Sequence, residues 1–174
     1  MTGKEIKDYA ESYLDEQIDD VDALRAINRA LNLLGDTALV NDTQEYDNVA
    51  ANVWQDLPAD LINVVFVEEG ASTKFTDYEV LNLKIRFKKS GSYKVYYRRL
   101  PQPIDSIFDT PEIHPAYHQC LVTYLSGWWR IKDDDESPDG LKNEQKFVED
   151  STRVFNQLRR NKRGPSTIEV IRHA

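Results

Sequence analysis

The three histidines are the first candidates for metal chemistry. His114 and His118 are four residues apart and would share one face of a helix, whereas His173 lies near the end of the sequence. Protein zinc sites commonly use an H-E-x-x-H pair or spaced cysteines. The chain has no H-E-x-x-H motif, and Cys120 is its one cysteine. The sequence therefore predicts structural or solvated histidines and no metal site.

An acidic run at residues 133–139 could instead supply oxygen ligands to calcium. If Asp135 opens an EF-hand loop, Gly140 takes the sixth position, as that loop requires. The twelfth position, which needs a bidentate glutamate, is occupied by Lys146. We therefore expect a solvated turn between two helices here.

Covalent catalysis and phosphate chemistry find little support in the sequence. Cys120 lies on the apolar face of a predicted helix, where a buried and unreactive thiol is expected. The chain contains no G-x-S-x-G, Walker A or G-x-G-x-x-G motif, and its seven glycines are scattered. We predict no catalytic residue, no cofactor and no enzyme. A small enzyme with an unrecognised carboxylate site stays open as a third hypothesis, since an acidic chain offers many carboxylate pairs.

Basic residues that alternate with apolar ones are the most informative pattern. Residues 83–88 and 93–98 both alternate, and a short loop containing serine and glycine joins them. Two such runs around a short loop are typical of a β-hairpin. We expect Leu83, Ile85, Phe87, Tyr93, Val95 and Tyr97 on one side of this hairpin. Five cations would share the other side: Lys84, Arg86, Lys88, Lys94 and Arg98.

The basic side of this hairpin has two interpretations. It could contact the phosphates of a nucleic acid without sequence preference, with Tyr96 stacking on a base. It could also be solvated, pair with the acidic helices of the same chain, or meet a protein partner such as the acidic first helix of a neighbouring copy. We favour the second interpretation, because the whole chain carries a net charge of -8.

The charges are arranged in blocks. Acidic residues outnumber basic ones in residues 1–69 and 105–150, and basic residues outnumber acidic ones in residues 70–104 and 151–174. Blocks of opposite sign indicate distinct faces for distinct contacts. With 40% hydrophobic and 10% aromatic residues, the chain is not a disordered acidic segment. It has no apolar run of about 18 residues and no signal-peptide core near Met1, which favours a cytosolic protein or a particle assembled there.

Several elements must position these residues. Thr2 and Glu5 form a capping box before a helix at about Gly3–Leu14, and apolar residues recur every three or four positions in a second helix that ends before Gly35. Residues 36–60 are rich in turn signals, with a short strand possible at 49–54. Residues 61–67 indicate a buried strand. Two further helices are expected at about 115–131 and 141–160, followed by a break at Gly164-Pro165 and a β-prone segment.

These elements predict a mainly α fold with a small antiparallel β insert. We expect a helical bundle with a projecting β-hairpin and an extended C-terminal tail. The bundle would form a single domain over residues 1–164, with the β insert at about 61–99 and the tail at 165–174.

The order of these features resembles the head–tail connector (adaptor) proteins of tailed bacteriophages. Three stretches carry the resemblance: DALRAINRALNLLGD at 22–36, LPADLINVVFVEEG at 57–70 leading to YYRRLPQPI at 96–104, and IHPAYHQCLVTYLSGWWRIKDDDES at 113–137. A last helix with a basic end follows them. Together the stretches span most of the chain, although no single motif is diagnostic.

The resemblance implies a structural role in the virion. Such a protein forms a ring of many copies, with twelve expected, beneath the portal, and it links the portal to a protein on the tail side. Genomic DNA would pass through the channel without sequence-specific binding. The resemblance implies no catalysis and no membrane partner. It places the protein at the head–tail junction of the virion and in the host cytoplasm during assembly.

The resemblance also suggests how the C-terminal segment acts. The docking residues would be Thr167, Ile168, Glu169, Val170, Ile171 and Arg172, which could add as a strand to the portal. The cations Arg159, Arg160, Lys162 and Arg163 would then meet an acidic partner surface. A frayed tail is the plain alternative. The alternative function for the whole chain is a non-specific nucleic-acid-binding module that uses the basic hairpin.

Overall fold

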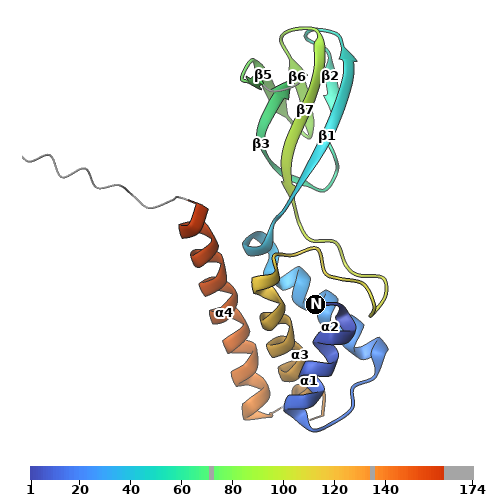
Figure 1. Cartoon of the computed structure of the whole chain (residues 1–174), viewed down its shortest axis with the longest axis vertical. Helices are drawn as coiled ribbons and strands as arrows, with labels where there is room; N and C mark the ends of the chain where they lie inside the picture. The colour runs from blue at the N-terminus through green and yellow to red at the C-terminus, as the bar shows by residue number, and fades with distance from the viewer. Residues whose placement is uncertain (71–72, 134–135, 163–174) are drawn as a thin grey trace, which may run out of the picture. The chain divides into compact units, whose positions relative to one another are not determined.

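The computed structural model describes residues 1–70, 73–133 and 136–162. The chain divides into two compact units (Figure 1). The helical unit consists of Met1–Ala30, Ile104–Thr110 and the chain from His114 onward, and the β unit consists of Leu31–Pro103 and Pro111–Ile113. The predicted β insert at about 61–99 lies inside the β unit, which begins earlier. The single domain predicted for residues 1–164 stays a prediction, and the tail at 165–174 lies outside the described residues.

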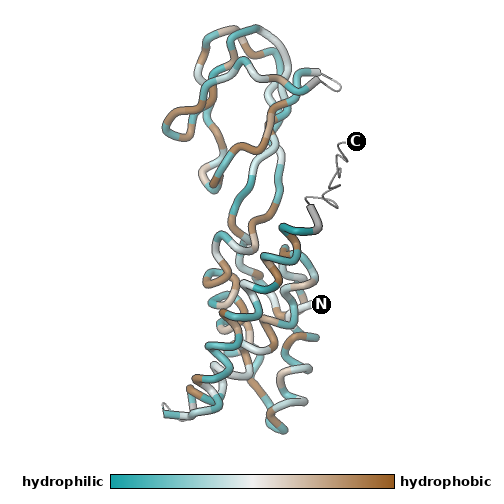
Figure 2. Tube along the Cα trace, turned by 90° about the vertical axis from the view of Figure 1, so that its left-hand side faces the viewer, coloured by the Kyte–Doolittle hydropathy of each residue, from teal (hydrophilic) through white to brown (hydrophobic). Residues whose placement is uncertain are grey.

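The helical unit is built around α3 (His118–Asp133), which packs against both α1 (Gly3–Leu14) and α4 (Pro138–Lys162). The unit also contains the larger part of α2 (Asp20–Leu34) and a short 3-10 helix, η2 (Pro115–Tyr117). Its buried residues follow the predicted periodicity and include Ile6, Ile27, Leu121, Leu125 and Phe147. Figure 2 shows hydrophilic and hydrophobic residues alternating along these helices, as expected where one face of each is buried.

Local signals positioned the helices well. The capping box at the start of α1 is confirmed: the Thr2 hydroxyl accepts a hydrogen bond from the Glu5 backbone N–H, and the Glu5 carboxylate accepts one from the Thr2 N–H. The predicted bounds of α1 agree with the structure. Close approach of α3 and α4 depends on small residues, because a Cβ atom added at Gly140 would lie 2.6 Å from the Ile131 Cγ1 atom.

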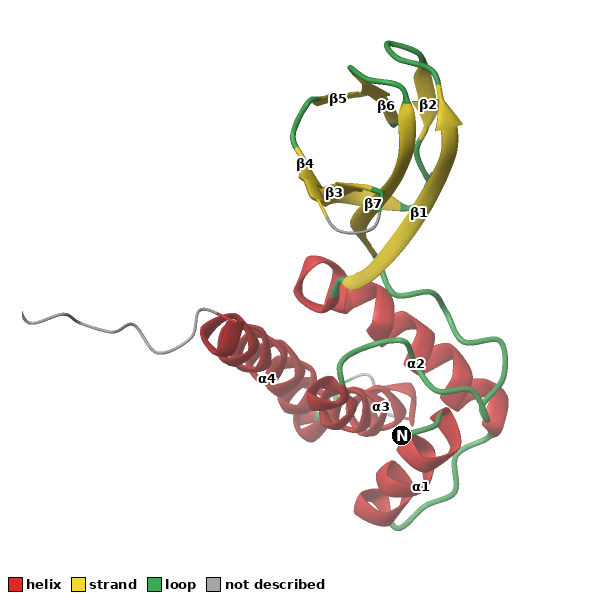
Figure 3. Ribbon diagram, turned by 45° about the horizontal axis from the view of Figure 1, so that its top comes forward, coloured by secondary structure: helices red, strands yellow, loops and turns green. Residues whose placement is uncertain are grey.

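The β unit contains two antiparallel sheets (Figure 3). The first has the strand order β1-β7-β3-β4 and the second β2-β6-β5. The strands are β1 (Val40–Val49), β2 (Trp54–Asp56), β3 (Leu61–Glu69), β4 (Thr73–Phe75), β5 (Tyr78–Leu81), β6 (Lys84–Phe87) and β7 (Gly91–Arg99), and a 3-10 helix, η1 (Gly35–Ala38), precedes them. Both sheets contribute to one core, where Phe87 of β6 stacks on Tyr93 of β7 with ring centroids 3.9 Å apart.

The predicted fold class is wrong. The described chain is an α/β protein with four α-helices and seven strands in two antiparallel sheets, not a mainly α bundle with a small β insert. The error lies in residues 36–60 and 70–81. Strand β1 consists mostly of polar residues and turn formers between Val40 and Val49, so its sequence resembles a loop. Its conformation comes from pairing with β7 along almost its whole length.

The predicted hairpin is also wrong in its pairing. Strand β6 pairs with β2 and β5, whereas β7 pairs with β1 and β3 in the other sheet. Strand β6 instead forms a hairpin with β5, through a turn at Asn82 and Leu83, which have φ values of 49° and 57°. Two positive φ angles in a row are characteristic of the tight turns that match strand twist. Leu83 lies in this turn and is exposed, not buried on the apolar side as predicted.

The predicted alternation of buried and more exposed side chains in β6 and β7 is confirmed. Ile85, Phe87, Tyr93, Val95 and Tyr97 are all buried. Period-two patterns report which residues face the core, but they do not report which strand lies next to which. The strand predicted at residues 61–67 also forms, although only its last residue, Val67, is buried.

Candidate interaction surfaces

Five basic residues were predicted to share one side of a hairpin, and four of them form ion pairs with acidic residues of the β unit. The Lys84 Nζ atom lies 3.2 Å from Asp56, and the Lys94 Nζ atom lies 2.9 Å from Glu45. Arg86 and Lys88 both pair with Glu79. The cations therefore meet acidic residues of neighbouring strands, not the acidic helices that the sequence interpretation named.

The five cations do not share one face of a hairpin. Lys84, Arg86 and Lys88 belong to β6 or follow it, whereas Lys94 and the half-buried Arg98 belong to β7 in the other sheet. The ion pairs also affect acidity. The hydrogen bond from Arg86 holds the pKa of Glu79 below its ordinary value, because it stabilises the charged carboxylate.

Tyr96, the residue predicted to stack on a base, contacts Phe66, Glu68 and Lys94. Its ring stacks on Phe66 with centroids 4.1 Å apart, and its hydroxyl donates to the Glu68 carboxylate over 2.9 Å. The Lys94 ammonium is 5.8 Å from the centroid of the Tyr96 ring. Because Phe66 already covers one face of this ring, stacking on a base would have to use the remaining face.

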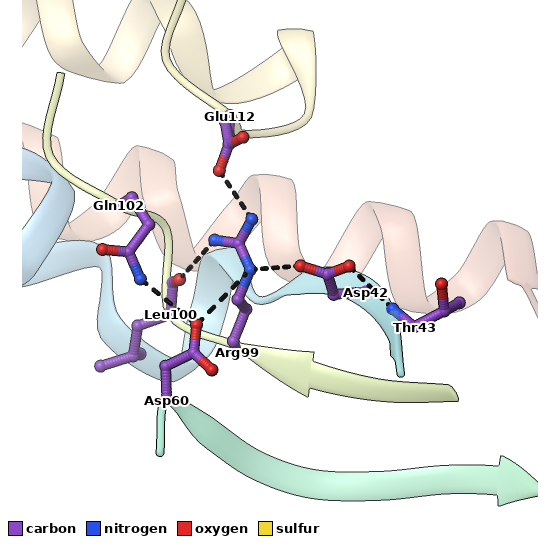
Figure 4. Close-up of polar contacts among 7 residues, drawn as sticks. All are labelled: Asp42, Thr43, Asp60, Arg99, Leu100, Gln102 and Glu112. Atoms are coloured by element: carbon purple, nitrogen blue, oxygen red, sulfur yellow. Dashed lines mark hydrogen bonds and ion pairs between the residues drawn. The ribbon is translucent and has the colours of Figure 1, made fainter. Parts of the chain in front are cut away.

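A buried arginine that sequence reasoning missed organises one end of the β unit (Figure 4). Arg99 ends β7 and is 9% exposed. Its Nε atom donates to Asp42 over 2.8 Å, and another guanidinium nitrogen donates to Glu112 over 2.9 Å. Asp60 lies 3.8 Å from the Nε atom. One cation thus joins the start of β1, the loop before β3 and the segment 111–113.

We call Arg99, Asp42, Asp60 and Glu112 the Arg99 cluster. Its ion pairs hold three segments of the β unit together. The hydrogen bond from Arg99 and the backbone N–H of Thr43 lower the pKa of Asp42, and the hydrogen bond to Asp42 raises the pKa of Arg99. A signal for this burial existed in the sequence. The odd-numbered residues Tyr93, Val95 and Tyr97 face the core, and Arg99 continues that series.

His114, His118 and Cys120 all lie in the helical unit, and His173 lies outside the described residues. The His114 Nδ1 atom accepts a hydrogen bond from the Ala116 N–H and so caps the 3-10 helix before α3. His118 is buried, and burial lowers its pKa. Cys120 is buried too, which raises the pKa of its thiol to about 11. Within residues 1–70, 73–133 and 136–162, no three metal-binding side chains gather into a group.

The predicted docking residues fall mostly outside the described chain. Arg159 and Arg160 are exposed near the end of α4, and Lys162 is its last residue. Arg163 and the segment from Thr167 to Arg172 lie beyond the described residues.

Comparison with known proteins leaves the chain without a family, because no family matches it and no curated protein sequence matches it either. None of the helices in the described part of the chain is long and apolar enough to cross a membrane.

Proposed function

We propose that this chain is a structural protein of a tailed bacteriophage, a head–tail connector. It assembles as a ring beneath the portal, docks onto the portal through its C-terminal segment and links the portal to the tail. The proposal rests first on the three sequence stretches that resemble such connectors.

The structural observation that carries the proposal is the end of α4. This helix is 25 residues long and ends at Lys162, five positions before Thr167, the first predicted docking residue. Residues 152–160 contain three arginines and no acidic residue. Arg159 and Arg160 are exposed near the helix end, where cations are also favoured by the helix dipole. A long helix with an exposed basic end is well suited to present the following segment to an acidic partner surface.

Native mass spectrometry of the full chain with the portal protein from the same phage tests this function. We expect a complex with the full chain and its loss when residues 165–174 are removed. The double variant Arg159→Glu/Arg160→Glu should weaken binding at least tenfold, and the wild-type complex should weaken with added salt. Arg25→Glu changes an exposed arginine elsewhere and is the matched control. The docking proposal fails if no complex forms or if the truncated chain binds as well as the full chain.

A further inference from the structure

Helix α1 presents an exposed surface that combines aromatic and acidic residues. Tyr9 and Tyr13 are one helical turn apart and are 54% and 63% exposed. Residues 8–16 contain four acidic residues and no basic one. The side chain of Asp8 is 54% exposed and pairs with Lys4 over 2.9 Å, an exposed pair that is weak. Large aromatic side chains that share an exposed helix face are typical of a contact surface. We call Asp8, Tyr9 and Tyr13 the α1 face.

Helix α4 presents an exposed surface that combines an apolar residue with an arginine. Val148 is 60% exposed, and the side chain of Arg153 is 76% exposed. Both line a shallow hollow that runs along α4 from Val148 to Arg160 and also includes Glu149, Thr152 and Gln157. We call Val148, Thr152, Arg153 and Gln157 the α4 face. Arg153 forms an ion pair with Asp150, three residues before it on the same helix, over 2.7 Å. Exposed ion pairs of this kind contribute little stability.

The two faces belong to helices that flank α3 within the helical unit. Both α1 and α4 pack on α3, and Figures 1 and 3 show α4 on one side of α3 and α1 on the other. An interface between two different faces of identical chains is heterologous, and its repetition produces a closed ring or a filament.

We propose that the α1 face of one copy binds the α4 face of a second copy. The occupant is a second copy because two segments have complementary charges: residues 8–16 contain four acidic residues and no basic one, and residues 152–160 contain three arginines and no acidic residue. Tyrosine and arginine are the residues most enriched at the centres of protein interfaces, and an arginine can lie over a tyrosine ring. This inference deepens the proposed function, which requires copies to associate, and it rests on that function only for the expectation of a closed ring.

Two double variants test the interface, one for each face. Tyr9→Ser/Tyr13→Ser removes the aromatic residues of the α1 face, and Val148→Ser/Arg153→Glu alters the α4 face. All four positions are exposed, so each variant should keep the circular dichroism spectrum of the wild type. Arg25→Glu is the matched control, because Arg25 is 73% exposed and pairs with an aspartate three residues away, as Arg153 does.

Sedimentation velocity and native mass spectrometry of the full-length chain measure the result. We expect the wild type and Arg25→Glu to form oligomers, and each double variant to weaken self-association at least tenfold. A mixture of the two double variants retains one intact contact per pair, so it should form one-to-one dimers and nothing larger. Wild-type assemblies larger than a dimer separate this heterologous interface from a twofold one, because a twofold interface closes at the dimer.

Three outcomes would overturn the inference: a wild type that stays monomeric at every concentration, a double variant that assembles like the wild type, or larger assemblies in the mixture. If the wild type assembles but both double variants do too, the α1–α4 contact is wrong while the connector function stands on its portal-binding test. The variants leave Arg159 and Arg160 intact, so portal docking is tested separately.

Discussion

Among the described residues, each unit buries one lysine or arginine, and the two cations find their partners in different ways. In the helical unit, Lys7 is 8% exposed and pairs with Glu11 over 3.1 Å and with Asp20 over 2.9 Å. In the β unit, Arg99 is 9% exposed and pairs with Asp42, which lies 57 residues away in sequence. Glu11 is one helical turn from Lys7, so a local rule places that pair. The Arg99–Asp42 pair exists only because β1 lies beside β7 in the sheet.

The comparison shows that a local helix rule supplies one of the two acidic partners of Lys7, whereas every acidic partner of Arg99 lies 13 or more residues away in sequence. The pKa values reflect both kinds of pair. Burial lowers the pKa of Lys7, but its hydrogen bonds to Asp20 and Glu11 outweigh that effect and raise the pKa above its ordinary value. Asp20 in turn has a lowered pKa because of Lys7.

The largest expected effect is a difference between Arg99 and Lys7 in the unfolding free energy lost when each is replaced. Arg99→Met leaves Asp42 and Glu112 without their buried partner, and we expect a loss of about 2–4 kcal/mol in unfolding free energy, since both carboxylates remain partly exposed. Lys7→Met keeps the apolar stem of the side chain and should cost about 1–2 kcal/mol. Urea unfolding followed by fluorescence and circular dichroism measures both values. Equal costs would contradict the distinction between distant and local partners.

A smaller effect of opposite sign is expected at the turn between β5 and β6. Leu83 has a φ of 57°, a backbone region that glycine adopts without strain and leucine does not. Because this side chain is 47% exposed, little packing is lost on its removal. Leu83→Gly should therefore stabilise the protein by about 0.5–1 kcal/mol in thermal or urea unfolding.

Leu83→Ala is the control for this turn, because it removes the side chain but retains the Cβ atom that causes the strain. It should give no gain. If alanine stabilises as much as glycine, the exposed side chain and not the backbone explains the effect.

The smallest effect concerns acid stability. Asp42 has a lowered pKa in the folded protein, so its pairing with Arg99 contributes stability above the unfolded pKa of about 3.9. That contribution is lost as the pH falls through the lower, folded pKa. We expect Asp42→Asn to destabilise the protein near neutral pH and to flatten the decline in stability on acidification. Urea midpoints measured from pH 7 to pH 2 show this, and a variant whose decline is as steep as that of the wild type would contradict it.

Residue patterns alone determined a large part of this structure. The capping box at Thr2, the bounds of α1 and the end of α2 before Gly35 depend on contacts within one or two helical turns, and those contacts are written in the local sequence. The inward series of β6 and β7 is equally local, since successive side chains of a strand face opposite sides. The sequence also shows that acidic residues gather in the second half of α1 and just after it, and that arginines gather in the second half of α4.

Only the tertiary structure decided the rest. The polar strand β1 has little strand propensity and forms because β7 offers it backbone hydrogen bonds. The division of β6 and β7 between two sheets depends on the turn at Asn82-Leu83 and on partners far away in the chain. Arg99 could be predicted to face inward but not to meet Asp42 and Glu112. Strand pairing is non-local and has no fixed spacing in sequence, whereas a helix carries its own hydrogen bonds, and this is why the helices were predicted and the sheets were not.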